Sequence, residues 1–281
     1  MQARKRIESL DFERLEQDGY VVLPELVRPE EIDRFEHDVA AIGEVLARRS
    51  GVEAAPGERF SEVLRRSGPH RTMLFDHLKR LYVIERLGVE IGAALEEAGL
   101  FRRHSLRAPI LWPTLRADLP GEDTYMFPLH QDYGTTRCRH AWRLWIPLRS
   151  ADEHYGTLRL AVGSHLLGPF RYVGEDTTYP HIDETEAARL GLEMRSFPVA
   201  AGDAILFDPR AIHGSVPNRS PRTKFVMLLH LQDMTTIVDP EDPNDPLRQF
   251  LDLTAAGKAA EKAGCGILAA VASVRPPSPP Q

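Results

Sequence analysis

The chain has 281 residues, of which 42% are hydrophobic and 27% are charged, a balance typical of a globular protein with a sizeable core. Its formal net charge of -6 gives no indication of a nucleic-acid partner, and its two cysteines are too few for a disulfide framework. We expect neither a secretory signal nor a membrane span, because no stretch has the apolar length that either requires. A cytoplasmic location follows as an expectation.

The N-terminal part of the chain, residues 7–100, is predicted to be mainly helical. Residues 7–18 carry apolar side chains at roughly helical spacing, and a short β-prone run follows at 20–23. A second helix is predicted to begin at Pro29, since proline and acidic residues are favourable in a first turn. Residues 72–98 again show helical periodicity.

Residues 107–232 change in character and predict the catalytic core. Short β-prone runs alternate there with glycine, proline and acidic turns, a pattern typical of a sandwich or jelly roll. The runs are Ala108–Trp112, Tyr125–His130, Ala141–Leu148, Thr157–Val162, Met194–Val199, Ala204–Phe207 and Lys224–Leu231. We therefore expect a mainly β fold, a double-stranded β-helix (cupin-like jelly roll), with the N-terminal helices packed on it.

Two further segments complete the predicted organisation. The polar and aromatic stretch 163–193 is expected to form a loop over one mouth of the barrel. Residues 233–281 predict a C-terminal extension with a helical patch at 251–262 and a proline-rich tail at 276–281. Because no internal repeat or linker divides the chain, residues 1–281 are expected to form a single domain.

Three side chains suggest a metal site. His130 and Asp132 are two positions apart, and on a strand such residues face the same side. His213 follows the apolar run 204–207 and could add a third ligand. Two histidines and one carboxylate form the facial triad that suits non-haem Fe(II) and leaves coordination positions open. Taken singly, a solvated His–Asp pair and a loop histidine explain these residues as well.

Arg222 suggests which cosubstrate would bind beside the metal. It follows His213 by nine positions and precedes an apolar strand. A guanidinium group there could bind the far carboxylate of a 2-oxo acid that chelates the metal, through two parallel hydrogen bonds. An ordinary surface arginine is the competing interpretation, because Arg219 lies close by.

Several blocks of the sequence resemble one enzyme family. The chain is similar to the phytanoyl-CoA dioxygenase family of Fe(II)- and 2-oxoglutarate-dependent dioxygenases over roughly residues 10 to 232. The matching blocks are QDGYVVLP at 17–24, RPEEI at 28–32, WIPL at 145–148, GTL at 156–158, VGSH at 162–165 and HGSVPNRS at 213–220 with Arg222.

The resemblance implies roles for individual residues. His130, Asp132 and His213 would be the catalytic iron ligands. Other positions would bind the 2-oxoglutarate cosubstrate: Arg222 and Ser215 at its carboxylate, Phe127 and Trp145 along the cavity, and Thr114 as a weaker candidate. His165 matches a structural turn of the family and is not expected to bind the metal.

The resemblance also implies a reaction. Dioxygen and 2-oxoglutarate would be consumed, succinate and CO2 released, and an unactivated carbon oxidised. Related halogenases carry a small residue at the carboxylate position, so the presence of Asp132 favours hydroxylation over halogenation. Desaturation, epoxidation and oxidative cyclisation use the same ligands and stay open.

The substrate is expected to be a polar small molecule of specialised metabolism, for example one with a carboxylate or phosphonate. Neither nucleic acid nor a membrane is expected as a partner. The residues near the expected iron that could contact it are Tyr125, Tyr133, Arg137, Arg143 and Arg159. Each of them could equally be a solvated residue of a strand.

Two rival functions use the same ligands. A non-catalytic jelly roll could bind a metal or a ligand, and a zinc hydrolase could use the same triad. The zinc hydrolase leaves Arg222 and Trp145 without a role, and it predicts activity without oxygen.

Overall fold

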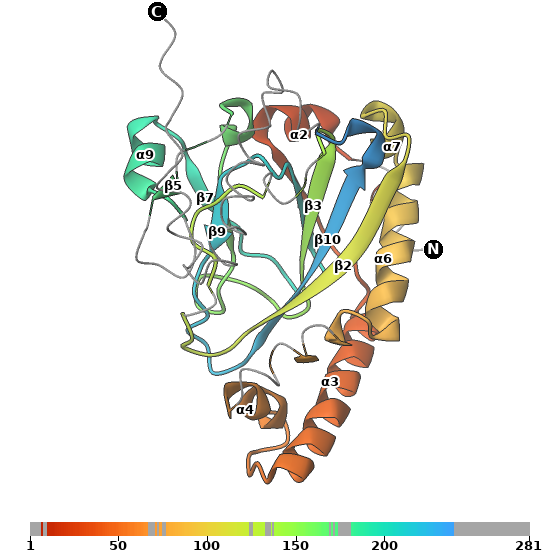
Figure 1. Ribbon diagram of the computed structural model, residues 1–281, viewed down its shortest axis with the longest axis vertical. Coiled ribbons are helices and arrows are strands. Elements are labelled where there is room, and N and C mark those ends of the chain that lie inside the picture. The colour runs from red at the N-terminus through yellow and green to blue at the C-terminus, as the bar shows by residue number, and fades with distance from the viewer. Residues whose placement is uncertain are drawn as a thin grey trace, which may run out of the picture.

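The computed structural model describes residues 7, 10–66, 71, 73–74, 77–123, 126–132, 136, 138–168, 170, 172–173 and 181–238. The N-terminal part is helical apart from one strand (Figure 1). Its elements are α2 (Phe12–Asp18), β1 (Tyr20–Leu23), α3 (Pro29–Ser50), α4 (Arg59–Arg66), α6 (Tyr82–Glu97) and α7 (Leu100–Arg103). None of the described helices is long and apolar enough to cross a membrane.

The β-structure that follows forms two main antiparallel sheets. The larger sheet has the order β1-β8-β3-β10-β2, and the smaller has the order β7-β4-β9. The strands of these two sheets after β1 are β2 (Pro109–Asp118), β3 (Ala141–Pro147), β4 (Leu158–Ala161), β7 (Met194–Ser196), β8 (Ala204–Phe207), β9 (His213–Ser215) and β10 (Lys224–Asp233). Facing antiparallel sheets with helices on one side confirm the expected jelly-roll core with helical decoration (Figure 1).

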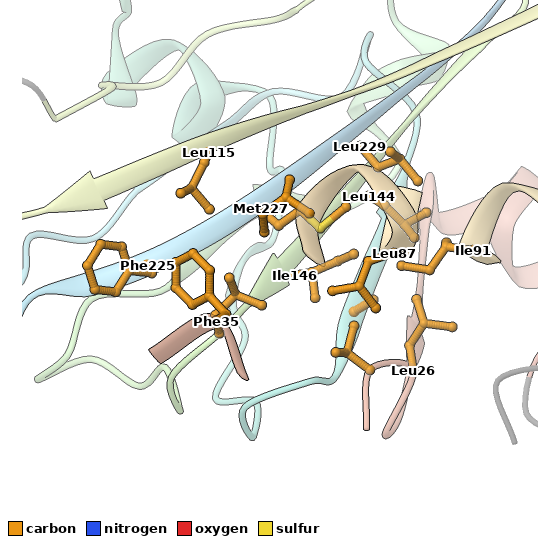
Figure 2. Close-up of a cluster of buried hydrophobic side chains, with 14 of the residues drawn as sticks. Leu26, Phe35, Leu87, Ile91, Leu115, Leu144, Ile146, Phe225, Met227 and Leu229 are labelled. Atoms are coloured by element: carbon orange, nitrogen blue, oxygen red, sulfur yellow. The ribbon is translucent and has the colours of Figure 1, made fainter. Parts of the chain in front are cut away.

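The outer face of the larger sheet packs against helices. Alternate residues of β10, namely Phe225, Met227 and Leu229, point to this face because side chains alternate along a strand. They meet apolar residues that recur every three or four positions on α3 and α6 (Figure 2). The resulting core contains no charged side chain among its clustered residues.

The inner face of the larger sheet looks toward the smaller sheet. Trp145 of β3 and Phe207 of β8 join Leu158 and Leu160 of β4 in a second apolar cluster. Polar and charged side chains also lie on this face, among them Arg116, Arg143, Lys224 and His230, and the candidate site lies beside them.

A glycine at the end of α2 shows how the N-terminal part is joined to the core. Gly19 has φ +82°, a conformation that favours glycine, and it ends the helix. A Cβ at this position would lie 2.5 Å from Nδ1 of His165. The Nε2 atom of His165 is 3.1 Å from the carbonyl oxygen of Glu16, so His165 joins α2 to the turn Ser164–Leu166 (η1).

The structure corrects several predicted boundaries. The helix predicted at 72–98 is wrong as one element, because a turn at 79–81 precedes α6. No strand covers residues 126–130; His130 forms only an isolated bridge. β2 continues well beyond Trp112 to Asp118, since β10 pairs with it throughout.

The stretch 163–193 is not a plain loop. Besides η1 it contains β5 (Tyr172–Val173), β6 (His181–Ile182) and α9 (Glu184–Arg189). A further short helix, η2 (Met234–Thr236), follows β10. The predicted helix at 251–262 and the tail at 276–281 lie outside the described residues.

Candidate metal centre

Backbone pairing brings the two candidate histidines together from distant parts of the sequence. The amide of His130 donates to the carbonyl of His213 at 2.8 Å, and the amide of His213 donates back at 2.9 Å. The amide of Asp132 donates to the carbonyl of Pro209 at 2.8 Å. The segment 130–132 is therefore held beside the chain that leads into β9, although it is not itself a strand.

The side chains of this triad turn toward a common point. Nδ1 of His130 lies 2.7 Å from the carbonyl oxygen of Pro128, and Nδ1 of His213 lies 2.9 Å from that of Ala211. Each histidine thus donates through Nδ1 and directs Nε2 inward. The Nε2 atoms lie 3.4 Å and 3.7 Å from the two carboxylate oxygens of Asp132.

The charges at the triad favour the protonation states that bind metal. Burial lowers the pKa of His213 to about 4, and the nearby His130 adds to this effect, so the imidazole is neutral at pH 7. Burial alone would raise the pKa of Asp132. The hydrogen bond with His130 and the charges of His213 and Arg143 outweigh it, and the pKa lies well below its usual value.

This donor set fits a ferrous ion. One ligand atom from each of His130, Asp132 and His213 lies within 4.8 Å of the others. Two imidazoles and one carboxylate, each imidazole oriented by a carbonyl at its far nitrogen, form the arrangement expected at a non-haem iron centre.

Arg143 contacts the triad directly. This β3 side chain is only 1% exposed; its Nε donates to Oδ2 of Asp132 at 3.0 Å and its Nη2 to Oγ1 of Thr136 at 2.5 Å. The Thr136 hydroxyl donates in turn to the carbonyl of Asp132 at 3.0 Å. Arg143 was predicted to contact substrate, whereas the structure places its guanidinium on a candidate iron ligand.

Gln131 lies between two ligands and points the other way. Its Nε2 donates to the carbonyls of Arg210 at 2.5 Å and Gly168 at 3.0 Å, and its Oε1 accepts from the amide of Phe170 at 3.0 Å. Gln131 therefore fixes the segment that carries His130 and Asp132. The sequence analysis gave neither Gln131 nor Thr136 a role; an amide side chain between two alternating ligands was the available signal.

A second polar cluster lies next to the triad, around Ser215 and Phe127. The amide of Ser215 donates to the carbonyl of Phe127 at 2.9 Å, and the Phe127 ring is 5.6 Å from the His130 ring. The guanidinium of Arg116 lies over the Phe127 ring at 4.4 Å, with its Nη1 3.5 Å from the Ser215 hydroxyl. Arg116, on β2, was not among the predicted site residues.

Arg116 belongs to a largely buried group of three charged side chains. Asp118 binds Nη2 of Arg116 at 3.0 Å and Nζ of Lys224 at 2.8 Å. Burial raises the pKa of Asp118, but the two cations outweigh it and bring the pKa to about 2. Lys224 is 1% exposed, and burial lowers its pKa. Asp118 therefore joins the side chains of Arg116 and Lys224.

The remaining predicted residues lie in different surroundings. Trp145 is buried in the cluster between the two sheets. Arg222 is exposed, and its carbonyl oxygen accepts from Asn218 and Ser220. Arg159 of β4 forms an ion pair with Glu184 of α9. Tyr125, Tyr133 and Arg137 lie outside the described residues.

Comparison with known proteins identifies the family. The model of the family described as phytanoyl-CoA dioxygenase matches residues 15–226. No curated protein sequence matches this chain.

Solved structures share the fold at low sequence identity. EvdO2 from Micromonospora carbonacea var. aurantiaca is 18% identical with a TM-score of 0.51, over 87% of this chain and 96% of that chain. The apo form of the non-haem monooxygenase ThoJ is 21% identical with a TM-score of 0.51, over 79% and 76%. The epimerase SnoN in complex with Fe3+, α-ketoglutarate and nogalamycin RO is 17% identical with a TM-score of 0.49, over 88% and 94%.

The family match covers most of the chain, and the ligand atoms of His130, Asp132 and His213 lie together in the structure. The chain belongs to the phytanoyl-CoA dioxygenase family and is a non-haem oxygenase that uses iron, 2-oxoglutarate and dioxygen.

Proposed function

We propose that His130, Asp132 and His213 bind the iron and that the enzyme hydroxylates an unactivated carbon of a polar small molecule. The convergence of these three ligand atoms within 4.8 Å carries the proposal. Iron with 2-oxoglutarate and dioxygen supplies the oxidising power, with release of succinate and CO2.

The protein's own part is to hold the ligands in place and exclude water. The carbonyls of Pro128 and Ala211 orient the two imidazoles through Nδ1, which leaves both Nε2 atoms free to face the iron. Arg143 holds Oδ2 of Asp132, so Oδ1 is the oxygen left for the metal. His213 is buried, and its ring centroid lies 4.7 Å from that of Phe207, which limits access of bulk water on that side.

For the cosubstrate, the geometry favours Arg116 over Arg222. Arg116 lies against both Ser215 and Phe127, two residues expected to contact 2-oxoglutarate, whereas Arg222 is exposed. A guanidinium group in that position could bind the far carboxylate of 2-oxoglutarate through two parallel hydrogen bonds, which supports Arg116 as its main partner.

Asp132 supports hydroxylation as the outcome. A carboxylate at this ligand position occupies the site that a halide would need. Desaturation, epoxidation and oxidative cyclisation remain the alternatives with the same cofactors. A zinc hydrolase would need no arginine beside Ser215, so the position of Arg116 argues against it. A non-catalytic binding protein is distinguished by the absence of turnover.

The test is anaerobic addition of Fe(II) and 2-oxoglutarate to the purified chain. Chelation by a 2-oxo acid gives a weak visible charge-transfer band, which a zinc hydrolase would not produce. We expect the band in the wild type and its loss in His130→Ala. The exposed His154 offers a matched control, since His154→Ala should keep the band. A band of full strength in His130→Ala would overturn the metal assignment.

The cosubstrate assignment has its own test. Lysine cannot reproduce the bidentate fork of arginine, so Arg116→Lys should raise the 2-oxoglutarate concentration that half-saturates the band, by about tenfold. Arg222→Lys should leave that concentration unchanged. The reverse result would assign the carboxylate to Arg222.

The proposed partner is a small-molecule substrate, with no nucleic acid and no membrane involved. A cytoplasmic location goes with this function, since ferrous iron survives best in a reducing compartment. Cell fractionation measures that location directly.

A further inference from the structure

One row of inner-face residues leads from the triad to the surface. His230 of β10 pairs with Arg143 of β3 on one side and with Trp112 of β2 on the other. Residues paired across neighbouring strands have adjacent side chains on the same face. Because Arg143 binds Asp132, the row runs from the candidate iron ligand through Arg143 and His230 to Trp112.

The outer end of this row is an aromatic stack. The rings of Trp112 and His230 are nearly parallel, with an interplanar angle of 3° and centroids 5.1 Å apart. Oγ1 of Thr114 lies 3.2 Å from Nε2 of His230 and fixes the orientation of that ring. Trp112 is 36% exposed and Ile110, the next inner-face residue of β2, is 38% exposed. An apolar, oriented ring surface therefore opens to solvent at the end of the row that begins at Asp132.

The row has no unpaired charge along it. The guanidinium of Arg143 is bound by the Asp132 carboxylate. Burial lowers the pKa of His230 to about 3, with a further lowering by Arg143, so this imidazole is neutral at pH 7. Arg159, expected to contact substrate, is paired with Glu184 on the far side of the smaller sheet. These residues offer an anion no favourable partner.

We propose that Trp112, with His230 and Thr114 behind it, forms a substrate subsite for an electrically neutral ring. A flat ring or the apolar face of a sugar ring would stack on the indole and present a carbon to the iron centre. This inference rests on the proposed function, because it assigns the substrate side of the same centre. It differs from the anionic substrate that the arginine-rich segments of the sequence suggest.

The chain's own fluorescence offers a direct measurement of the subsite. Of its three tryptophans, Trp142 and Trp145 are buried, whereas Trp112 is partly exposed. Acrylamide should therefore quench mainly Trp112. The chain is loaded with Fe(II) and 2-oxoglutarate without oxygen, and 4-nitrophenyl glucoside and 4-nitrophenyl glucuronide are compared as neutral and anionic probes of the same shape.

We expect the neutral glucoside to perturb the charge-transfer band and, in a parallel titration with the non-absorbing methyl glucoside, to protect Trp112 from acrylamide. Trp112→Ala should weaken the band perturbation about tenfold, and Trp112→Phe should restore most of it. Tyr82→Ala, at a 75% exposed aromatic residue of α6, is the matched control and should change nothing.

Three results would overturn the subsite: tighter binding of the glucuronide, unchanged binding in Trp112→Ala, or no effect of either neutral glucoside. Each counts only while the charge-transfer band itself forms. If the wild type gives no band with Fe(II) and 2-oxoglutarate, the proposed function fails instead, so the two failures are distinguishable.

Discussion

On β10, Phe225, Met227 and Leu229 point to the helices, whereas Lys224, Leu228 and His230 point to the smaller sheet. The same alternation runs through β2 and β3. One strand thus supplies an apolar outer face and a polar inner face, and the period of two residues keeps them separate.

The two faces contribute differently to the free energy of folding. Each large apolar side chain buried on the outer face stabilises the fold by about 1.5–3 kcal/mol. The inner face buries Arg143 and Lys224 and partly buries Asp118, and the desolvation of these charges is unfavourable unless each has a partner. The helix-covered face therefore stabilises a sheet whose other face is arranged for binding and catalysis.

The largest expected effect on stability comes from breaking a buried charge pair on the inner face. Asp118→Asn leaves Arg116 and Lys224 without their shared anion. We expect the free energy of unfolding to fall by about 3–5 kcal/mol, measured by urea denaturation. Ile146→Val on the outer face should lower it by only about 0.5–1.5 kcal/mol. A smaller loss in Asp118→Asn than in Ile146→Val would contradict this ranking.

Leu228 and Leu229 are adjacent on β10 and point to opposite faces of the larger sheet, so substituting each in turn compares the two faces. Leu229→Ala opens a cavity beneath the helices and should lower the free energy of unfolding by about 2–5 kcal/mol (Figure 2). The charge-transfer band of the folded protein should be unaffected. Leu228, half-buried on the inner face opposite Trp145, should show a smaller stability loss when changed to alanine. Equal losses at both positions would mean that the faces do not differ as argued.

Substitution of Arg143 tests whether a residue of the inner face affects Fe(II) affinity. Arg143→Gln removes the Nε donor to Oδ2 of Asp132. Groups that orient a ligand usually contribute 10- to 100-fold to metal affinity, so we expect a decrease of about that size in Fe(II) affinity. Arg195→Gln, at a half-exposed arginine of β7, is a control that should leave the affinity unchanged. Calorimetric titration of Fe(II) without oxygen measures both.

The sequence was sufficient to predict the sheet class and the triad because both depend on local patterns. Apolar runs indicated β3, β8 and β10. His130 and Asp132 were singled out by their spacing of two positions, and His213 by its place after the apolar run 204–207. Arg116 could not be found in this way. The predicted strand ended at Trp112, whereas β2 continues to Asp118 and includes Arg116. That the Arg116 side chain faces the smaller sheet follows only from the pairing of β2 with β10.

The contact between Arg143 and Asp132 illustrates a second limit of sequence reasoning. Alternation correctly indicated that Arg143 shares the side of Trp145. It did not indicate whether the guanidinium would meet substrate or a carboxylate, since that depends on where the segment 130–132 is held. Backbone hydrogen bonds to His213 and Pro209 fix the position of this segment, and local periodicity in the sequence predicts neither of them.

The smallest expected effect is the acid sensitivity of the inner face. The pKa of Asp118 is depressed to about 2 from its ordinary 3.8, so its stabilising contribution is present above about pH 4 and is lost as pH falls toward 2. The full contribution is about 2 kcal/mol, of which about half should be gone at pH 3.

Urea denaturation between pH 5 and pH 3 measures this loss when the wild type is compared with one variant on each face of the sheet. Leu229→Ala lowers stability without touching the charges, so it should lose free energy on acidification as steeply as the wild type. Asp118→Asn has no carboxyl at that position to protonate, and its loss should be smaller by about 1 kcal/mol at pH 3. An equal decrease in the free energy of unfolding from pH 5 to pH 3 in all three proteins would contradict this prediction. It would show that the carboxyl of Asp118 titrates alike in the folded and unfolded chains.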